Sequence, residues 1–351
     1  MNIDRPCRRL LFLTLLATFF LASRASAETR TVRWIVAHAR DDQSFKGLLD
    51  AFAGRVAERS QGRLKVEFID VKADSQRTDA DADKIAFSKL TDGSADMSQI
   101  AAGRMGVRVI DEPFLFRSYE HAEAVWRGPL GKTLLDEVAS ENQDRVRGLA
   151  FAYSGGFRVF VGQAAVRKLS DFKGLRMEDT GGEPAALLRA LGVKLVSLSP
   201  AQYAAVKAPL TLPVTGSVDL AETEINGLAY VRAKFPETAK KLKYVDVTRH
   251  SMLVTAMAVN DKFFRSLSPD DRRLLTEEVQ SLSLAERKLS VSLAQRNLKL
   301  FARSGLEIVT LPAEEQLKFA KVGEAIQEKS GQLALIQQIQ AVGEIPLQAS
   351  R

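Results

Sequence analysis

The chain has 351 residues, with 50 lysines and arginines against 43 aspartates and glutamates, and a net charge of +7. Four arginines and one aspartate fall within residues 1–27, so the remaining chain carries a net charge of +4. That balance gives no indication of nucleic-acid binding. The single cysteine, Cys7, also lies in this segment, so the rest of the chain folds without disulfides.

Residues 1–27 have the pattern of a secretory signal peptide. Arg5, Arg8 and Arg9 precede an apolar run at 10–22, and the small residues "ASA" at 25–27 suit a cleavage site. The run of about thirteen residues is shorter than the roughly twenty that cross a bilayer as a helix. We therefore expect an exported periplasmic protein that begins near Glu28 and is not inserted in a membrane.

Strand and helix patterns alternate along the mature chain. Residues 29–39 are typical of a buried strand, residues 44–62 of a helix that ends at a glycine, and "RLKVEFI" alternates like a second strand. A strand, helix and strand in about forty residues form a βαβ unit, which indicates an α/β fold. Further helices are predicted within 81–93, within 120–142 with a break at Gly128-Pro129, and at 183–192.

The longest predicted helix covers 269–303. Ser268 can cap it, Pro269 can open it, and Gly305 closes it. At 1.5 Å per residue this helix is about 52 Å long, which exceeds one lobe. The mature chain of about 324 residues also exceeds the size at which single cores stop growing. We therefore expect two lobes, interwoven by several crossings and spanned by this helix.

The sequence offers little catalytic or metal-binding machinery. Its three histidines, His38, His121 and His250, are far apart and favour no metal site, and no nucleophile elbow or P-loop is present. The acidic run "DADAD" lacks the glycine and glutamate of a calcium loop and is interpreted as an acidic helix start. We expect no metal and no cofactor, and binding rather than turnover.

Six stretches then occur in a characteristic order: "KLTDGSADM", "DEPFLFRSYEHAEAVWRGPLGKTLLDEV", "SGGFRVF", "LSDFKGLRM", "TGSVDLAETE" and "NDKFFRSLSPDDRRLL". Together they resemble the solute-binding proteins of tripartite ATP-independent periplasmic (TRAP) transporters, over about residues 32–305. The resemblance implies a two-lobe periplasmic binding protein that closes on a small solute and delivers it to membrane permease subunits. Substrates in the family are mostly organic anions with a carboxylate.

Within that fold we expect one lobe from 28–153 plus 249–285 and a second lobe from 154–248 plus 286–345. Strands near 152–157 and 247–257 are the expected crossings. Closure would occur by hinge motion around them.

The chain departs from the family at its main ligand contact. The family strand after "D-[LF]-K-G-L" usually reads "K-[IVL]-R", and its arginine forms a two-pronged salt bridge to the substrate carboxylate. Aligning "DFKGLRMED" places Glu178 at that arginine, whereas Arg158 in "GGFR" matches a second family arginine near the ligand. Either both residues line the cleft and bind a zwitterion, an amine or a polyol, or they pair with each other, or Glu178 faces solvent and the pocket is altered.

Five further residues are candidates for the site. Glu222, Glu224 and Asn226 could hydrogen-bond a polar ligand or be solvated, and Tyr153 and Phe157 could form an aromatic wall or pack in the core. The run "KAPLTLP" at 207–213 interrupts a helix with two prolines and predicts an extra loop at the cleft edge.

Two alternatives to transport stay open. The same protein could present a bound ligand to a membrane sensor instead of a permease. A secreted hydrolase or lyase using Glu178, Asp179 and Glu222 is the other alternative, and it predicts turnover of the solute.

Overall fold

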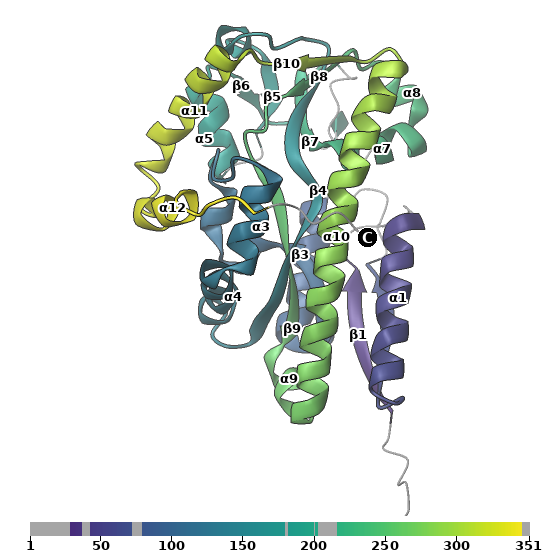
Figure 1. The fold of residues 1–351 in the computed structure, drawn as a ribbon. Helices are drawn as coiled ribbons and strands as arrows, with labels where there is room; N and C mark the ends of the chain where they lie inside the picture. The colour runs from purple at the N-terminus through teal and green to yellow at the C-terminus, as the bar shows by residue number, and fades with distance from the viewer. Residues whose placement is uncertain are drawn as a thin grey trace, which may run out of the picture.

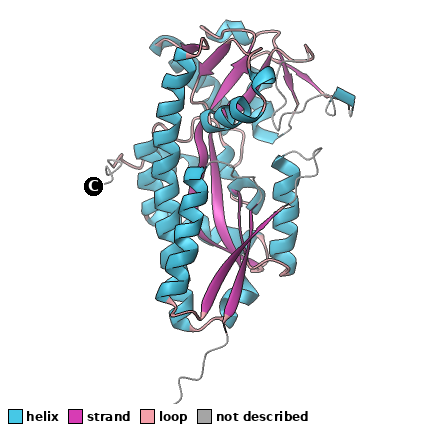
Figure 2. Ribbon diagram, turned by 90° about the vertical axis from the view of Figure 1, so that its right-hand side faces the viewer, coloured by secondary structure: helices cyan, strands magenta, loops and turns pink. Residues whose placement is uncertain are grey.

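A computed structural model describes residues 29–36, 43–71, 79–179, 182–199, 201–202 and 216–345. The expected signal peptide, His38 and the expected loop at 207–213 lie outside these ranges. Within them the chain forms an eight-stranded sheet and a two-stranded sheet, with helices along their faces (Figure 1, Figure 2).

The first βαβ units form one edge of the large sheet. They comprise β1 (Arg30–Val36), α1 (Gln43–Arg59), β2 (Leu64–Asp70), α2 (Asp79–Asp92) and β3 (Met97–Ala101). β1 pairs in parallel with both β2 and β3, which confirms the predicted unit. The apolar face of β1 packs on α1, where the rings of Trp34 and Phe52 lie 5.3 Å apart, edge to face. α2 begins within the acidic "DADAD" run, as predicted.

The next elements contain two helices separated by the predicted break at Gly128. They are η1 (Ala102–Met105), η2 (Arg108–Asp111), α3 (Tyr119–Arg127), α4 (Pro129–Glu141) and β4 (Val146–Gly162). The side chain of Ser118 caps α3 by accepting a hydrogen bond from the backbone of His121 at 3.0 Å. Gly128 ends α3 and precedes Pro129, the first residue of α4, because proline suits the first turn of a helix.

The second half of the chain completes the sheet at its other edge. Its elements are η3 (Leu169–Phe172), β5 (Arg176–Glu178), α5 (Gly182–Ala190), β6 (Lys194–Val196), β7 (Leu220–Glu224), α7 (Ile225–Lys234), α8 (Pro236–Ala239), β8 (Tyr244–Val247), β9 (Met252–Asn260), α9 (Asp261–Ser266), α10 (Pro269–Arg303), β10 (Glu307–Thr310), α11 (Ala313–Gln327) and α12 (Leu333–Gln340). The large sheet has the order β10-β8-β4-β9-β3-β1-β2, with β7 also paired to β4, and β5 pairs in parallel with β6.

β4 lies between β8 and β9 and takes part in both halves of the large sheet. Its residues 146–157 pair antiparallel with β9, and its residues 158–162 pair with β7 and β8. The register with β9 shifts between Tyr153 and Gly156, where Gly155 and Gly156 have φ angles of 110° and 82°. Glycine adopts such angles without the steric penalty of a Cβ atom. An irregularity of this kind lets one strand bend between two differently oriented parts of a sheet.

α10 is the predicted spanning helix, and its 35 residues run along the sheet from α9 at the lower end to the level of β10 at the upper end (Figure 1). Ser268 caps it by accepting from the backbone of Asp271 at 3.1 Å, and Gly305 follows its end with a φ of 88°. The helix, its cap and its closing glycine are therefore confirmed. The lobe boundaries given above stay a prediction.

The middle of α10 is held to β4 by buried polar contacts. Ser290 donates to the carbonyl of Tyr153 at 2.9 Å, and the Arg287 guanidinium donates to Glu123 of α3 at 2.7 and 3.0 Å. Both charged groups are almost fully buried, but each is paired, as buried ions must be. These contacts fix α10 against β4 immediately before the glycine pair.

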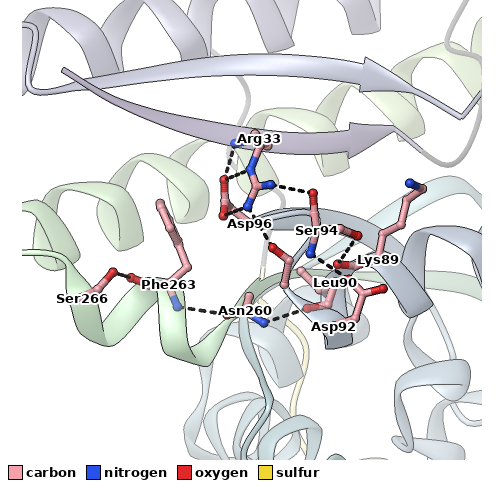
Figure 3. Close-up of polar contacts among 10 residues, drawn as sticks. Arg33, Lys89, Leu90, Asp92, Ser94, Asp96, Asn260, Phe263 and Ser266 are labelled. Atoms are coloured by element: carbon pink, nitrogen blue, oxygen red, sulfur yellow. Dashed lines mark hydrogen bonds and ion pairs between the residues drawn. The ribbon is translucent and has the colours of Figure 1, made fainter.

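Between β1 and the end of α2 a second arginine joins several elements (Figure 3). Arg33 of β1 donates from Nε and Nη2 to the two carboxylate oxygens of Asp96, at 2.9 and 2.7 Å. Its remaining hydrogen bonds go to the carbonyls of Gly93 and Ser94, both at 2.9 Å. Nearby, the Asn260 amide donates to the carbonyl of Leu90 at 2.9 Å. This network ties β1, the end of α2 and the start of α9 together.

Candidate ligand-binding site

Arg158 lies on a polar face formed by β4 and β7. In the antiparallel register Arg158 is opposite Glu224, and Phe160 is opposite Glu222. Side chains alternate between the two faces of a sheet, so these four side chains share a face. Val159 points to the other face, where it belongs to an apolar core. The sheet register thus brings one arginine and two glutamates together.

The guanidinium of Arg158 is partly enclosed by those two carboxylates. Its Nη1 donates to Oε2 of Glu222, and its Nε lies 3.7 Å from Oε1 of Glu224. The side chain of Arg158 is 26% exposed, against 15% for Glu222 and 13% for Glu224. A guanidinium has five N–H donors. In the part of the chain that the structure describes, the Arg158 guanidinium donates one hydrogen bond, to Glu222. Its other N–H groups therefore have no acceptor among the described residues.

The charges of this cluster are mutually stabilised. Burial disfavours the charged form of Arg158, but Glu222 and Glu224 outweigh it and raise the pKa of the guanidinium. Burial would likewise raise the pKa of Glu222, but Arg158 and His250 hold that pKa at about 2. Glu222 is therefore ionised at neutral pH and acts as a hydrogen-bond acceptor.

His250 completes the cluster from the segment between β8 and β9. Its Nε2 lies 2.6 Å from Oε1 of Glu222, and its Nδ1 lies 2.7 Å from the hydroxyl of Thr248. Because an ionised carboxylate can only accept, Nε2 carries a proton, which leaves Nδ1 to accept from the hydroxyl of Thr248. The ring stacks on Phe160 at 4.5 Å and is 1% exposed.

Glu178 lies on a separate small sheet. Met177 of β5 is buried, and its neighbours Arg176 and Glu178 lie on the opposite face. Arg176 binds Asp219 with two hydrogen bonds of 3.1 and 2.6 Å, so its charge is already matched. Arg158 pairs with Glu222 and Glu224 within the described ranges, and the pair with Glu178 that the sequence left open is not formed.

The other candidate residues are mainly engaged in packing. Asn226 donates to the carbonyl of Ser290 at 3.1 Å and accepts from Asn297 at 3.0 Å, which joins α7 to α10. Tyr153 is fully buried and Phe157 is 6% exposed, both in one apolar core. The structure therefore brings together Arg158, Glu222 and Glu224. The side chains of Asn226, Tyr153 and Phe157 are engaged in other contacts.

Sequence reasoning missed Thr248 and His250. His250 contacts Glu222 across 28 residues of sequence, and neither residue belongs to a motif that marks a ligand site. His250 packs in the interior, and its ring also contacts the charged cluster.

Neither a metal site nor a membrane span is found in the described ranges. Histidine, aspartate and glutamate side chains nowhere gather there in a group of three that could hold a metal ion. No helix in those ranges combines the length and apolar content needed to cross a bilayer.

Comparison with known proteins identifies the family. Residues 36–332 match the family model described as "Bacterial extracellular solute-binding protein, family 7". The 2,3-diketo-L-gulonate-binding periplasmic protein YiaO of Escherichia coli is 27% identical over 74% of this chain and 75% of its own length. The C4-dicarboxylate-binding periplasmic protein DctP of Rhodobacter capsulatus is 26% identical over 68% and 70%, respectively.

Solved structures show the same fold. A TRAP periplasmic solute-binding protein of Pseudomonas putida F1, with bound D-glucuronate, has a TM-score of 0.73 at 20% identity. The match covers 90% of this chain and 98% of that one. The α/β fold with a long C-terminal helix is therefore confirmed, and the alternative of a secreted hydrolase or lyase is excluded by the family. The chain belongs to family 7 of the bacterial extracellular solute-binding proteins, the TRAP periplasmic binding proteins, which bind and transport solutes and are not enzymes.

Proposed function

We propose that this protein captures a hydroxyl-rich solute with at most one carboxylate and delivers it to TRAP permease subunits. The solute binds beside Arg158, between the lobes 28–153 plus 249–285 and 154–248 plus 286–345. The observation that carries this proposal is the pairing of Arg158 with both Glu222 and Glu224.

Charge at the site disfavours ligands with several carboxylates. One arginine faces two glutamates, and Asp111 adds a further negative charge that acts on Arg158. A dicarboxylate would bring two more negative charges into a partly desolvated cluster, where repulsion is weakly screened. Hydroxyl groups avoid this repulsion, because each can donate to a glutamate and accept from Arg158.

The position of Glu178 supports the same ligand class. It stands where the family resemblance places the arginine that grips the substrate carboxylate, and a carboxylate there removes that fork. A single ligand carboxylate can still reach those donors of Arg158 that no described residue accepts. The E. coli relative is named for 2,3-diketo-L-gulonate, a sugar acid with one carboxylate and several hydroxyls.

The proposal includes the compartment and the partner. Residues 1–27 act as a signal peptide, so the exported protein begins near Glu28 and works in the periplasm. Membership of a transporter family supports a permease as the receiving partner. Mass spectrometry of the protein from a periplasmic extract should give an N-terminus at Glu28, whereas retention of residues 1–27 would contradict this part.

A thermal-shift screen of the exported protein tests the ligand class. The panel contains sugar acids, polyols, C4-dicarboxylates, amino acids and polyamines. A solute at about a thousand times its Kd stabilises the fold by roughly 4 kcal/mol, which raises Tm by several degrees in a chain of this size. We expect the largest shifts with sugar acids and polyols and none with C4-dicarboxylates.

Two matched variants locate the site. Arg158→Ala should abolish the shift, because the ligand loses its cationic donor. Arg167→Ala removes an exposed arginine paired with Glu307 and should leave the shift unchanged. A shift with C4-dicarboxylates that survives Arg158→Ala would contradict the proposal.

A further inference from the structure

We infer that Glu222 is a built-in counter-ion of Arg158, held in place by His250 and Thr248, and that it biases the site toward hydroxyl rather than carboxylate ligands. The inference rests on the proposed function and assigns positioning roles to two residues outside the family motifs.

The four side chains form one continuous chain of hydrogen bonds. The hydroxyl of Thr248 donates to Nδ1 of His250 at 2.7 Å, and Nε2 of His250 donates to Oε1 of Glu222 at 2.6 Å. The other oxygen of Glu222 accepts from Nη1 of Arg158. Thr248 is 6% exposed and His250 is 1% exposed, so water competes little for these bonds.

His250 is itself immobilised on every side. Its ring lies flat on Phe160 with an angle of 5° between the planes, and its carbonyl accepts from the backbone of Phe114 at 2.7 Å. Glu222, which can only accept, fixes a proton on Nε2, and Thr248 contacts the other ring nitrogen. Glu222 cannot swing away from Arg158 without leaving a buried N–H of His250 without its acceptor, which is unfavourable.

This arrangement changes what Arg158 can bind. A ligand carboxylate binds a guanidinium best through two parallel N–H bonds, from Nη1 with Nη2 or from Nε with Nη2. Glu222 takes Nη1, and Glu224 lies 3.7 Å from Nε. Each forked edge therefore has one nitrogen facing a protein carboxylate. Within the described ranges Nη2 is the one nitrogen that no carboxylate of the protein approaches in these contacts, which suits a hydroxyl or carbonyl oxygen.

Isothermal titration with D-gluconate and D-sorbitol tests the inference, because they share a six-carbon hydroxylated chain and differ in one terminal carboxylate. If the panel yields a tighter sugar acid, that acid and its alcohol replace them. Glu222→Gln keeps an acceptor for His250 and removes the charge. We expect the preference for the acid over the alcohol to rise about tenfold. Glu307→Gln, an exposed glutamate paired with Arg167, is the control and should leave the preference unchanged.

Two His250 variants separate positioning from simple packing. His250→Phe keeps a ring on Phe160 but has no donor, so Glu222 is released and the preference should shift in the same direction, by about threefold. His250→Gln can donate to Glu222 and accept from Thr248, and it should restore the wild-type preference. His250→Phe also decides the question if Glu222→Gln does not fold.

The outcomes separate the inference from the function on which it rests. An unchanged preference in both Glu222→Gln and His250→Phe overturns the inference while the proposed function stands. Failure of the wild-type protein to bind any solute of the panel overturns the proposed function itself. A changed preference in Glu307→Gln as well would show a long-range charge effect and would also overturn the specific role of Glu222.

Discussion

Arg33 and Arg158 are both strand arginines paired with carboxylates, but the protein uses them differently. Arg33 makes four side-chain hydrogen bonds, two to Asp96 and two to backbone carbonyls (Figure 3). Arg158 makes one, to Glu222, within the described ranges. An arginine whose donors are satisfied by the protein holds the fold together. Arg158 keeps donors that no described residue accepts, beside a bend in the sheet, and we therefore propose it, rather than Arg33, as the ligand contact.

The same contrast separates Arg158 from Arg176. Arg176 binds Asp219 through a fork, as Arg33 binds Asp96. It thereby neutralises a charge on the small sheet that carries Glu178. The number of unsatisfied guanidinium donors, rather than the presence of an arginine, therefore distinguishes the candidate site from the structural ion pairs.

The largest effect is expected from Arg33→Ala, which tests the structural half of the comparison. Asp96 is 3% exposed and would keep only the backbone N–H of residue 33 in place of the guanidinium, whose side chain is 40% exposed. Removing one member of a fully buried pair costs about 3–5 kcal/mol, and the exposure of Arg33 places this loss at the low end of that range. Urea unfolding should show this loss, while the solute affinity of the folded fraction stays within about twofold. A loss below about 1 kcal/mol would show that Arg33 is not a structural clamp.

Asp246→Asn examines a buried carboxylate that forms no ion pair with an arginine in the described ranges, where Arg167 acts on it only from a distance. Asp246 is fully buried on β8; its Oδ1 accepts from the backbone of Val166, whereas its Oδ2 has no hydrogen-bond partner in the described ranges. Burial raises its pKa to about 7 from 3.8. Ionisation therefore penalises the folded state, with no penalty below about pH 4 and the full penalty above about pH 7.

Asparagine cannot ionise, so the variant should be more stable than the wild-type protein by roughly 2–4 kcal/mol at pH 8. This advantage should shrink steadily toward pH 4. Denaturant unfolding at several pH values measures it. A constant difference across that range would show that Asp246 is not the titrating group.

The smallest loss of stability is expected from a substitution at the bend in β4, where Gly155 and Gly156 precede Arg158. Gly156 has a φ of 82°, and an added Cβ atom would lie 2.3 Å from the hydroxyl of Tyr119. Gly174 has a φ of 84° with nothing within 4 Å, which makes it a matched control. Gly174→Ala should cost about 1 kcal/mol from backbone strain alone. Gly156→Ala should cost about 1–2 kcal/mol more, because Tyr119 must move.

Thermal unfolding of the two variants side by side gives the comparison. Equal losses would indicate that Tyr119 moves without cost and that the bend is loosely packed.

Local signals were enough to predict much of the fold. The caps at Ser268 and Gly305 defined α10, and Gly128-Pro129 defined the break between α3 and α4, since these depend on neighbouring residues only. A strand near 152–157 was expected as a crossing, but the full extent of β4, Val146–Gly162, was not predicted. Its continuation depends on pairing with β7, β8 and β9, which come later in the chain.

The site was less accessible to sequence reasoning. Arg158, Glu222 and Glu224 were candidates through the family resemblance, but their mutual pairing depends on the β4–β7 register. The contact between Glu222 and His250 and that between Arg176 and Asp219 join residues 28 and 43 positions apart. No local pattern encodes such contacts, so the role of His250 became visible in the folded chain.

A crystal structure of the protein with the tightest solute of the panel would show whether Arg158 holds the solute. We expect Nη2 of Arg158 to donate to an oxygen of the solute while Glu222 stays bound to Nη1 and to His250. A solute that binds away from Arg158, or a ligand carboxylate that displaces Glu222 and takes both nitrogens, would contradict this expectation.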